Sequence, residues 1–223
     1  MIPLRSTERV YATAVVTASL IALNALVFLY QATLNPYALN EFVGQWGIVP
    51  DSRPFHVASL LTSMFLHGGW MHLIGNMLFL WVFGRNLEDL IGGGRFLLFY
   101  LLCGFAAAVA HVVLNANSRV PTIGASGAIA GVMGAYLIKF PRARIITLIP
   151  IFVFITTMEI PAWLLLLYWF GIQFLSGIGS LAETDYTGGG VAWFAHVGGF
   201  IAGMLLIRLF PARKRWRSWY ADE

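Results

Sequence analysis

Long stretches without a charged residue dominate this chain and limit what it can fold into. Residues 10–34 and 57–84 contain no Asp, Glu, Lys or Arg. Across all 223 residues, 59% are hydrophobic and 11% are charged, whereas a soluble domain carries about 25% charged residues. A helix needs about 20 apolar residues to cross the hydrocarbon core of a bilayer. The sequence therefore predicts an integral membrane protein with one domain over residues 1–223.

The apolar segments predict an all-α polytopic protein, a bundle of six membrane-spanning helices. The spans are expected, in chain order, at residues 10–34, 70–84, 96–115, 122–138, 161–181 and 191–209. The mixed segment after the first span contains Pro, Trp and Tyr, which favours an interfacial loop between the first two spans. Residues 145–158 are apolar but too short to span, so we expect a re-entrant or interfacial segment there. Residues 182–190 read as a glycine-rich loop.

Basic residues support six spans. With an inner N-terminus, all of the 14 Lys and Arg residues except Arg53 and Arg119 fall on the inner side. A seventh span at residues 145–158 would place the five C-terminal basic residues outside. Both termini are therefore predicted in the cytoplasm. Because no organelle-targeting segment precedes the first span, we expect the plasma membrane of a prokaryote. The net charge of +4 follows this topology and does not indicate nucleic-acid binding.

Two polar side chains with glycine neighbours lie inside predicted spans. Ser126 is expected about four residues into the fourth span and His196 about five into the sixth, both roughly 6–8 Å below the outer helix ends. An intramembrane histidine is rare and usually functional. At matched depth, the imidazole can accept the serine proton and make the hydroxyl a nucleophile. The alternative reading is that both motifs only serve packing.

Glycines on the same two spans are spaced for close helix contact. Gly127 and Gly131 form one small-xxx-small pair, and Gly199 and Gly203 form another. Such pairs let helix backbones approach each other in lipid. We therefore expect the two spans to pack together and to bring Ser126 to His196.

The second span contributes two further polar residues. His72 and Asn76 are four residues apart, on one helical face, and both can donate hydrogen bonds. With the backbone N–H of Ser126 they are suited to bind an oxyanion, and the alternative is polar contact between helices. Glu88 and Asp89 are expected to form a local ion pair or cap. No metal or cofactor is predicted, since no His-Glu-x-x-His pattern is present.

The combination of these motifs resembles one known family. Three short patterns occur in the order His72-x-x-x-Asn76, Gly124-x-Ser126-Gly127 and Ala195-His196-x-Gly198-Gly199. Together they resemble the rhomboid family of intramembrane serine proteases. In some members an aromatic residue follows the serine by one turn and packs on the histidine. Ala130 occupies that position here, and Tyr136, Trp193 or Phe194 are candidates to replace it.

The resemblance implies a serine endopeptidase with a Ser126–His196 dyad and no acidic third residue. His72, Asn76 and the Ser126 amide would hold the oxyanion. The partners implied are the lipid bilayer and single-span membrane proteins, cleaved near the outer face. A transporter is disfavoured because no span carries a coupling carboxylate. A non-catalytic protein that binds unstable membrane helices is the alternative, and nothing in the sequence predicts an oligomeric state.

Overall fold

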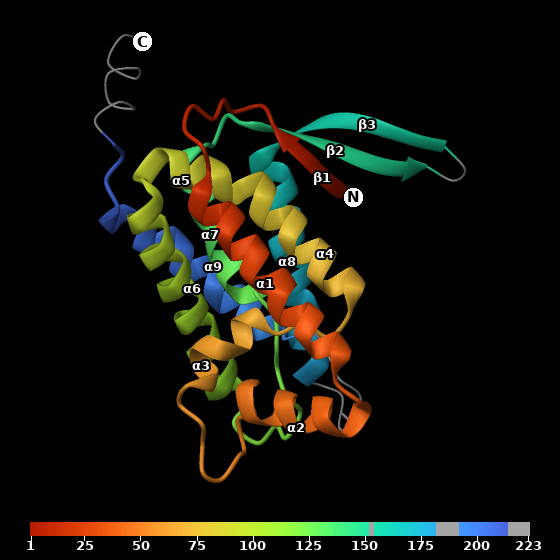
Figure 1. Cartoon of the computed structure of the whole chain (residues 1–223). Coiled ribbons are helices and arrows are strands. Elements are labelled where there is room, and N and C mark those ends of the chain that lie inside the picture. The colour runs from red at the N-terminus through yellow and green to blue at the C-terminus, as the bar shows by residue number, and fades with distance from the viewer. Residues whose placement is uncertain (152–153, 182–191, 214–223) are drawn as a thin grey trace.

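The computed structural model describes residues 1–151, 154–181 and 192–213, and the predicted loop at residues 182–190 lies outside this part (Figure 1). The described chain is mostly helical. Its α-helices are α1 Val15–Thr33, α2 Pro36–Trp46, α3 Ser59–Thr62, α4 Trp70–Phe79, α5 Arg85–Ile91, α6 Gly93–Leu114, α7 Ser126–Lys139, α8 Ala162–Leu181 and α9 Trp193–Leu206. Short 3-10 turns cover Ser63–Phe65 and Ile207–Leu209, and a π-helical turn covers Leu80–Gly84. The strands are β1 Ile2–Ser6, β2 Arg144–Ile151 and β3 Phe154–Pro161.

Several of these helices are apolar enough to lie in a membrane. Among the described residues, α1 and α6 alone are long enough to cross it, by length and composition. Shorter apolar helices cover Ser126–Lys139, Ala162–Ser176 and Trp193–Leu209. α4 runs through the π-helical turn directly into α5. The helical structure at the predicted second span therefore continues to Ile91, past the expected end at residue 84.

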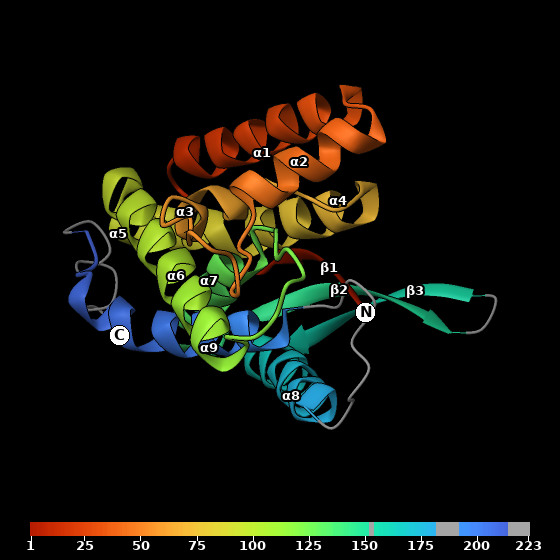
Figure 2. The same cartoon turned by 90° about the horizontal axis from the view of Figure 1, so that it is seen from below.

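α7 forms the centre of the molecule. Every residue from 127 to 136 is buried, and Figure 2 shows α7 between α1 on one side and α8 on the other. Gly, Ala and other small residues make up much of this helix, so neighbouring helices can approach its backbone. α7 is the scaffold on which the surrounding helices pack.

The contact between α7 and α9 is the closest helix pairing in the core, and glycines make it possible. A Cβ atom at Gly199 would overlap the carbonyl oxygen of Gly127, and one at Gly203 would overlap the backbone of Gly131. On the other face of α7, a Cβ at Gly131 would also overlap the Cys103 side chain of α6. The spacing of these glycines therefore lets the two helix backbones touch. A residue with a side chain at these positions would push the helices apart.

A three-stranded antiparallel sheet contradicts the all-α prediction. The order is β1-β2-β3, with Ile2 opposite Leu148 and Arg144 opposite Pro161. The segment at residues 145–158, predicted as re-entrant or interfacial, forms mainly a β-hairpin. β-branched residues at 145–147 favour strands, and alternate ones are buried, since Ile145 and Thr147 are fully covered. The strand at residues 2–6 was not expected, because it precedes the apolar run.

Glu88 and Asp89 form hydrogen bonds with residues that are distant in sequence, and not with their neighbours as predicted. The Glu88 carboxylate accepts hydrogen bonds from the backbone N–H groups of Val16 (2.8 Å) and Thr17 (2.7 Å), at the start of α1. Asp89 accepts those of Tyr11 and Ala12. No side chain of its own caps α1, and carboxylates favour the positive end of a helix dipole. The two carboxylates therefore hold the start of α1 against α5. The sequence had predicted a local ion pair or cap, which would have joined only neighbouring residues.

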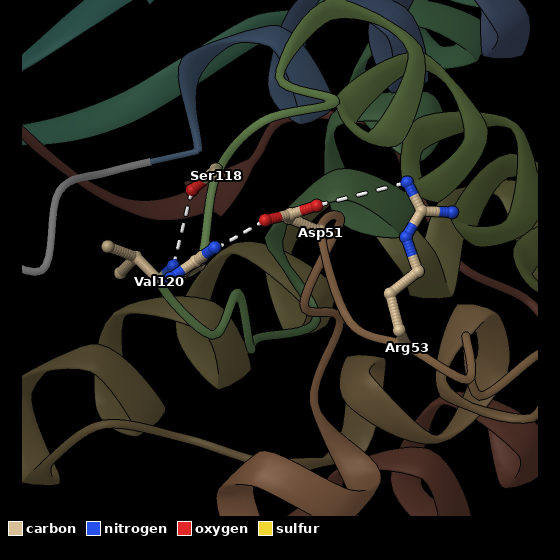
Figure 3. Close-up of polar contacts among 5 residues, drawn as sticks. Asp51, Arg53, Ser118 and Val120 are labelled. Atoms are coloured by element: carbon tan, nitrogen blue, oxygen red, sulfur yellow. Dashed lines mark hydrogen bonds and ion pairs between the residues drawn. The ribbon is translucent and has the colours of Figure 1, made fainter.

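The segment between α1 and α4 covers the end of the molecule opposite the sheet (Figure 1). It carries α2 and α3, and it is joined to the loop before α7. Ile48 and Thr122 pair as an isolated β-bridge. Asp51 accepts a hydrogen bond from Arg119 at 3.0 Å and lies 3.9 Å from Arg53 (Figure 3). These contacts hold the backbone that leads into Ser126.

The glycine contact can be tested by adding one methyl group. We expect Gly203→Ala to lower the free energy of unfolding by about 1–3 kcal/mol, because the new Cβ overlaps the α7 backbone and helices must separate. Gly171→Ala on α8 is the matched control, since nothing lies within 4 Å of its Cβ position. Thermal unfolding in detergent measures both. Equal melting temperatures for the two variants would contradict the glycine contact.

Candidate active site

Ser126 is the first residue of α7, which differs from the predicted position. The sequence placed it about four residues inside a span starting at residue 122, but residues 120–124 are not helical. Pro121 lies in this segment, and Gly124 has a φ of +129°, a conformation that glycine adopts readily. The N–H groups of the first helical turn have no acceptor within the helix. The Ser126 N–H is therefore one of the donors that have no acceptor within α7.

His196 and Ser126 contact each other directly. His196 Nε2 lies 2.7 Å from Ser126 Oγ. The imidazole is buried on α9, in its first turn. The glycine contact between α7 and α9 sets this distance, because Gly127 directly follows Ser126 and Gly199 lies one helical turn after His196. The described geometry is that of a hydroxyl beside a proton acceptor.

Gln173 on α8 completes the surroundings of His196, and sequence reasoning missed it. The Nδ1 atom of His196 hydrogen-bonds the Gln173 side-chain oxygen. The ring of Trp169, one turn earlier on α8, lies 5.7 Å from the imidazole, and Trp193 lies 6.4 Å from it. A glutamine inside the apolar run 161–181 was the available signal.

The residues expected to support the imidazole are therefore only partly those observed. Of the candidates, Trp193 lies beside His196. Tyr136 does not, because its hydroxyl bonds Ser6 of β1 at 2.6 Å, at the sheet end. No ring contact joins Phe194 to His196 among the described residues. Trp169 of α8 thus provides the aromatic contact with His196 that α7 lacks, because Ala130 occupies the corresponding position.

His72 and Asn76 lie on the other side of the same cavity. His72 Nδ1 accepts a hydrogen bond from the Gly68 N–H at 3.4 Å, which leaves the proton on Nε2. A Cβ at Gly124 would lie 2.8 Å from that Nε2 and 3.7 Å from Asn76 Nδ2. The Asn76 amide nitrogen is buried and has no hydrogen-bond partner within the described structure. Two donors are thus available close to the start of α7.

His67 lies behind His72 and stays uncharged. Gln31 of α1 holds its backbone through two hydrogen bonds, at 3.0 and 3.2 Å. Its ring meets the His72 ring edge to face at 5.2 Å. Burial, and to a smaller extent the neighbouring His72, lowers the pKa of His67 to about 4. These contacts give His67 a packing role in the loop before α4.

The polar residues line one cavity of about 750 Å³. Ser126, His196, His72, Asn76 and Gln173 contribute to its wall. Apolar residues make up most of the remainder, including Met71, Phe79, Met133 and Trp169. The volume is large enough for a short stretch of peptide together with water. No group of three His, Cys, Asp or Glu side chains in the described ranges could hold a metal ion.

Comparison with known proteins agrees with the sequence patterns. Residues 54–213 match the family model of the Rhomboid domain. "Rhomboid protease GluP" of Bacillus subtilis is 47% identical over 78 residues, which is 35% of this chain and 15% of that protein. "Rhomboid protein 1, mitochondrial" of Saccharomyces cerevisiae is 31% identical over 66% of this chain and 40% of its own length. "RHOMBOID-like protein 1" of Arabidopsis thaliana is 32% identical over 82% of this chain and 42% of its own length.

The chain spans less than half the length of each of these relatives. The domain match, in contrast, covers most of this chain and includes the serine, the histidine and both cavity donors. It confirms the resemblance predicted from the three short patterns, and the chain belongs to the rhomboid family.

Proposed function

We propose that this chain is an intramembrane serine endopeptidase that cleaves transmembrane-helix substrates near the outer face. The observation that carries the proposal is the 2.7 Å contact between Ser126 Oγ and His196 Nε2, inside a cavity large enough for peptide. Rhomboid-family proteins are membrane-integral, and a relative from Bacillus subtilis is named as a protease. A serine hydroxyl beside an imidazole is the minimal pair for acyl transfer.

In the proposed reaction, His196 Nε2 accepts the Ser126 proton while Oγ attacks the scissile carbonyl carbon. The tetrahedral intermediate collapses when the imidazolium gives that proton to the leaving amine, which leaves an acyl ester on Ser126. Water then attacks the ester, with His196 first accepting a proton and then returning it to Oγ. The peptide bond is broken and one water is consumed.

The oxyanion of both tetrahedral intermediates needs donors on the opposite side of Ser126. His72 Nε2–H, Asn76 Nδ2 and the Ser126 N–H are the proposed set. The unpartnered Asn76 nitrogen supports this role, because a buried donor without an acceptor costs about 1–3 kcal/mol in the resting protein. An oxyanion would satisfy it only during the reaction, which favours the transition state.

The membrane arrangement is also part of the proposal. α1, the continuous α4–α5 segment, α6, α7, α8 and α9 form six spans, with both termini in the cytoplasm. The distribution of basic residues supports this orientation: the sheet end includes Arg5, Arg85 and Arg144, whereas Arg53 and Arg119 lie at the α2–α3 end. A prokaryotic plasma membrane remains part of the proposal.

Substrates would be single-span membrane proteins that enter laterally from the lipid. A helix protects its carbonyls with its own hydrogen bonds, so the substrate must unwind locally before Ser126 can attack. α8 is the proposed gate, and its outer half carries exposed Phe174. Water reaches the dyad from the outer face through the cavity.

Removing either member of the dyad tests the protease proposal. We expect Ser126→Ala and His196→Ala each to reduce cleavage of a single-span reporter by about 10⁴-fold or more, and the double variant to lose little further, because the two act as one unit. Fragment release in proteoliposomes, quantified on gels, gives the rates.

Ser6→Ala is the control, since it removes another hydrogen-bonded serine hydroxyl, which is buried at the sheet end. It should retain cleavage. Equal fragment release by wild type and Ser126→Ala would show that the chain does not cut. Retained reporter binding with no cleavage by the wild type would favour the non-catalytic helix-binding alternative.

The oxyanion donors should affect turnover more than binding. We expect Asn76→Ala and His72→Ala each to lower kcat by about 10²-fold with KM changed less than about threefold, because their bonds form in the transition state. Asn86→Ala serves as the control, a buried asparagine on α5 that donates to Glu8. A rise in KM at unchanged kcat would assign the two residues to substrate binding instead.

The orientation can be tested with single cysteines, because Cys103 is buried and can be replaced by Ala. In that background, Arg119→Cys should react with a membrane-impermeant maleimide in intact cells. Arg144→Cys should react only after permeabilisation. Arg119 and Arg144 have side chains 87% and 55% exposed, so both new thiols are accessible to reagent. Labelling of both in intact cells would contradict the six-span count.

A further inference from the structure

α8 carries one buried polar side chain that the proposed reaction leaves unused. Gln173 is 8% exposed and lies in the apolar α8 helix. A side-chain amide in such surroundings is costly unless it is hydrogen-bonded. Its oxygen accepts a hydrogen bond from His196 Nδ1, on the side of the ring away from Ser126. The placement points to a task connected with the imidazole.

We propose that Gln173 is a positioning residue that sets the tautomer and the orientation of His196. This inference rests on the proposed protease function. A neutral imidazole carries one proton, on Nδ1 or on Nε2. Only the form with the proton on Nδ1 leaves an Nε2 lone pair for the Ser126 proton. The Gln173 oxygen can accept but not donate, so it stabilises that form.

The geometry on α8 fixes the ring as well as its proton. Trp169 and Gln173 are four residues apart and therefore on one helical face. The indole of Trp169 lies 5.7 Å from the imidazole at an angle of 42°, while Gln173 holds one ring nitrogen. Together they leave the imidazole little freedom to rotate away from Ser126. Trp169 also packs 6.3 Å from Phe200 of α9, so the two helices share one aromatic contact.

A neutral amide suits this position better than a carboxylate would. A carboxylate buried in apolar surroundings is expensive unless it is paired or strongly hydrogen-bonded. In the part of the chain that the structure describes, no Asp or Glu hydrogen-bonds His196. An amide oxygen provides the required acceptor and adds no charge to the span. Gln173 thus does the orienting work that an aspartate does in a soluble Ser-His-Asp triad.

The test compares two substitutions that keep the length of the side chain. Gln173→Met removes the acceptor, and Gln173→Glu keeps an acceptor oxygen. We expect Gln173→Met to lower kcat by about 10- to 100-fold with KM within about twofold, because only the fraction of His196 in the right tautomer reacts. Gln173→Glu should retain more than about a third of the wild-type kcat. Cleavage of the single-span reporter gives both constants.

Nitrogen NMR gives a readout that a merely structural role would not change. In protein labelled with ¹⁵N-histidine at pH 8, the wild type should show His196 as the Nδ1–H tautomer, identified by the signal missing from His196→Ala. Gln173→Met should show a mixture, and Gln173→Glu the wild-type form. Asn24→Leu is the control for loss of a buried amide, since Asn24 lies on α1 and its side chain donates a hydrogen bond to the backbone of Leu20. It should change neither the tautomer nor kcat.

The outcomes separate this inference from the protease proposal. If the wild type cleaves and Gln173→Met has an unchanged kcat and tautomer, Gln173 is not a positioning residue, while the protease proposal stands. If Gln173→Met shows the mixture of tautomers but keeps the wild-type kcat, the tautomer is not what limits cleavage and the inference is wrong. If the wild type and Ser126→Ala release fragments equally, the protease proposal itself fails. In that case a change of tautomer in Gln173→Met would show only that Gln173 hydrogen-bonds His196, and the positioning role in cleavage would fall with the protease proposal.

Discussion

The contact of backbone with backbone between α7 and α9 determines the rest of the site. Gly199 and Gly203 face Gly127 and Gly131 so closely that a single methyl group would overlap main-chain atoms. Because Ser126 precedes the first of these glycines and His196 lies one turn before Gly199, the same contact brings hydroxyl and imidazole to 2.7 Å. In lipid, helices gain little from burying apolar surface, so close packing of small residues is the available source of association. Packing and chemistry thus have one cause here.

Much of the site could be predicted because its signals are local. Ser126, His196, His72 and Asn76 are polar residues in apolar runs, where each must be explained, and the family match confirms the resemblance they suggested. Gln173 carried the same signal, as a polar residue in an apolar run, but it stands among bulky aromatic residues and was not predicted. Its importance depends on which way α8 faces, and helical periodicity in a uniformly apolar helix does not reveal that. Its distance of 23 residues from His196 gives no indication of contact either.

The parts of the fold that could not be predicted depend on pairing between distant segments. β1 lies before the apolar run and forms a strand only because β2, some 140 residues later, offers its edge. The role of Glu88 and Asp89 likewise depends on the start of α1, more than 70 residues away. The predicted position of Ser126 within its helix was wrong for a related reason. Composition extends a span from residue 122, but the bridge from Ile48 to Thr122 and the positive φ at Gly124 hold this stretch extended.

The position of Ser126 at the first residue of α7 has a chemical consequence. A serine in the middle of a helix would have its own N–H engaged with the carbonyl four residues earlier, whereas the N–H of the first residue of α7 has no acceptor within the helix and lies at its positive end. A developing oxyanion beside Ser126 would meet that free donor, with Asn76 and His72 on the other side. The set contains no carboxylate, ammonium or guanidinium group. The site can therefore lie within apolar surroundings at small cost and still provide directed dipoles when charge develops, which is the condition for electrostatic catalysis without an ion. An amide at Gln173, in the place where soluble enzymes use a carboxylate, follows from the same restriction on buried charge.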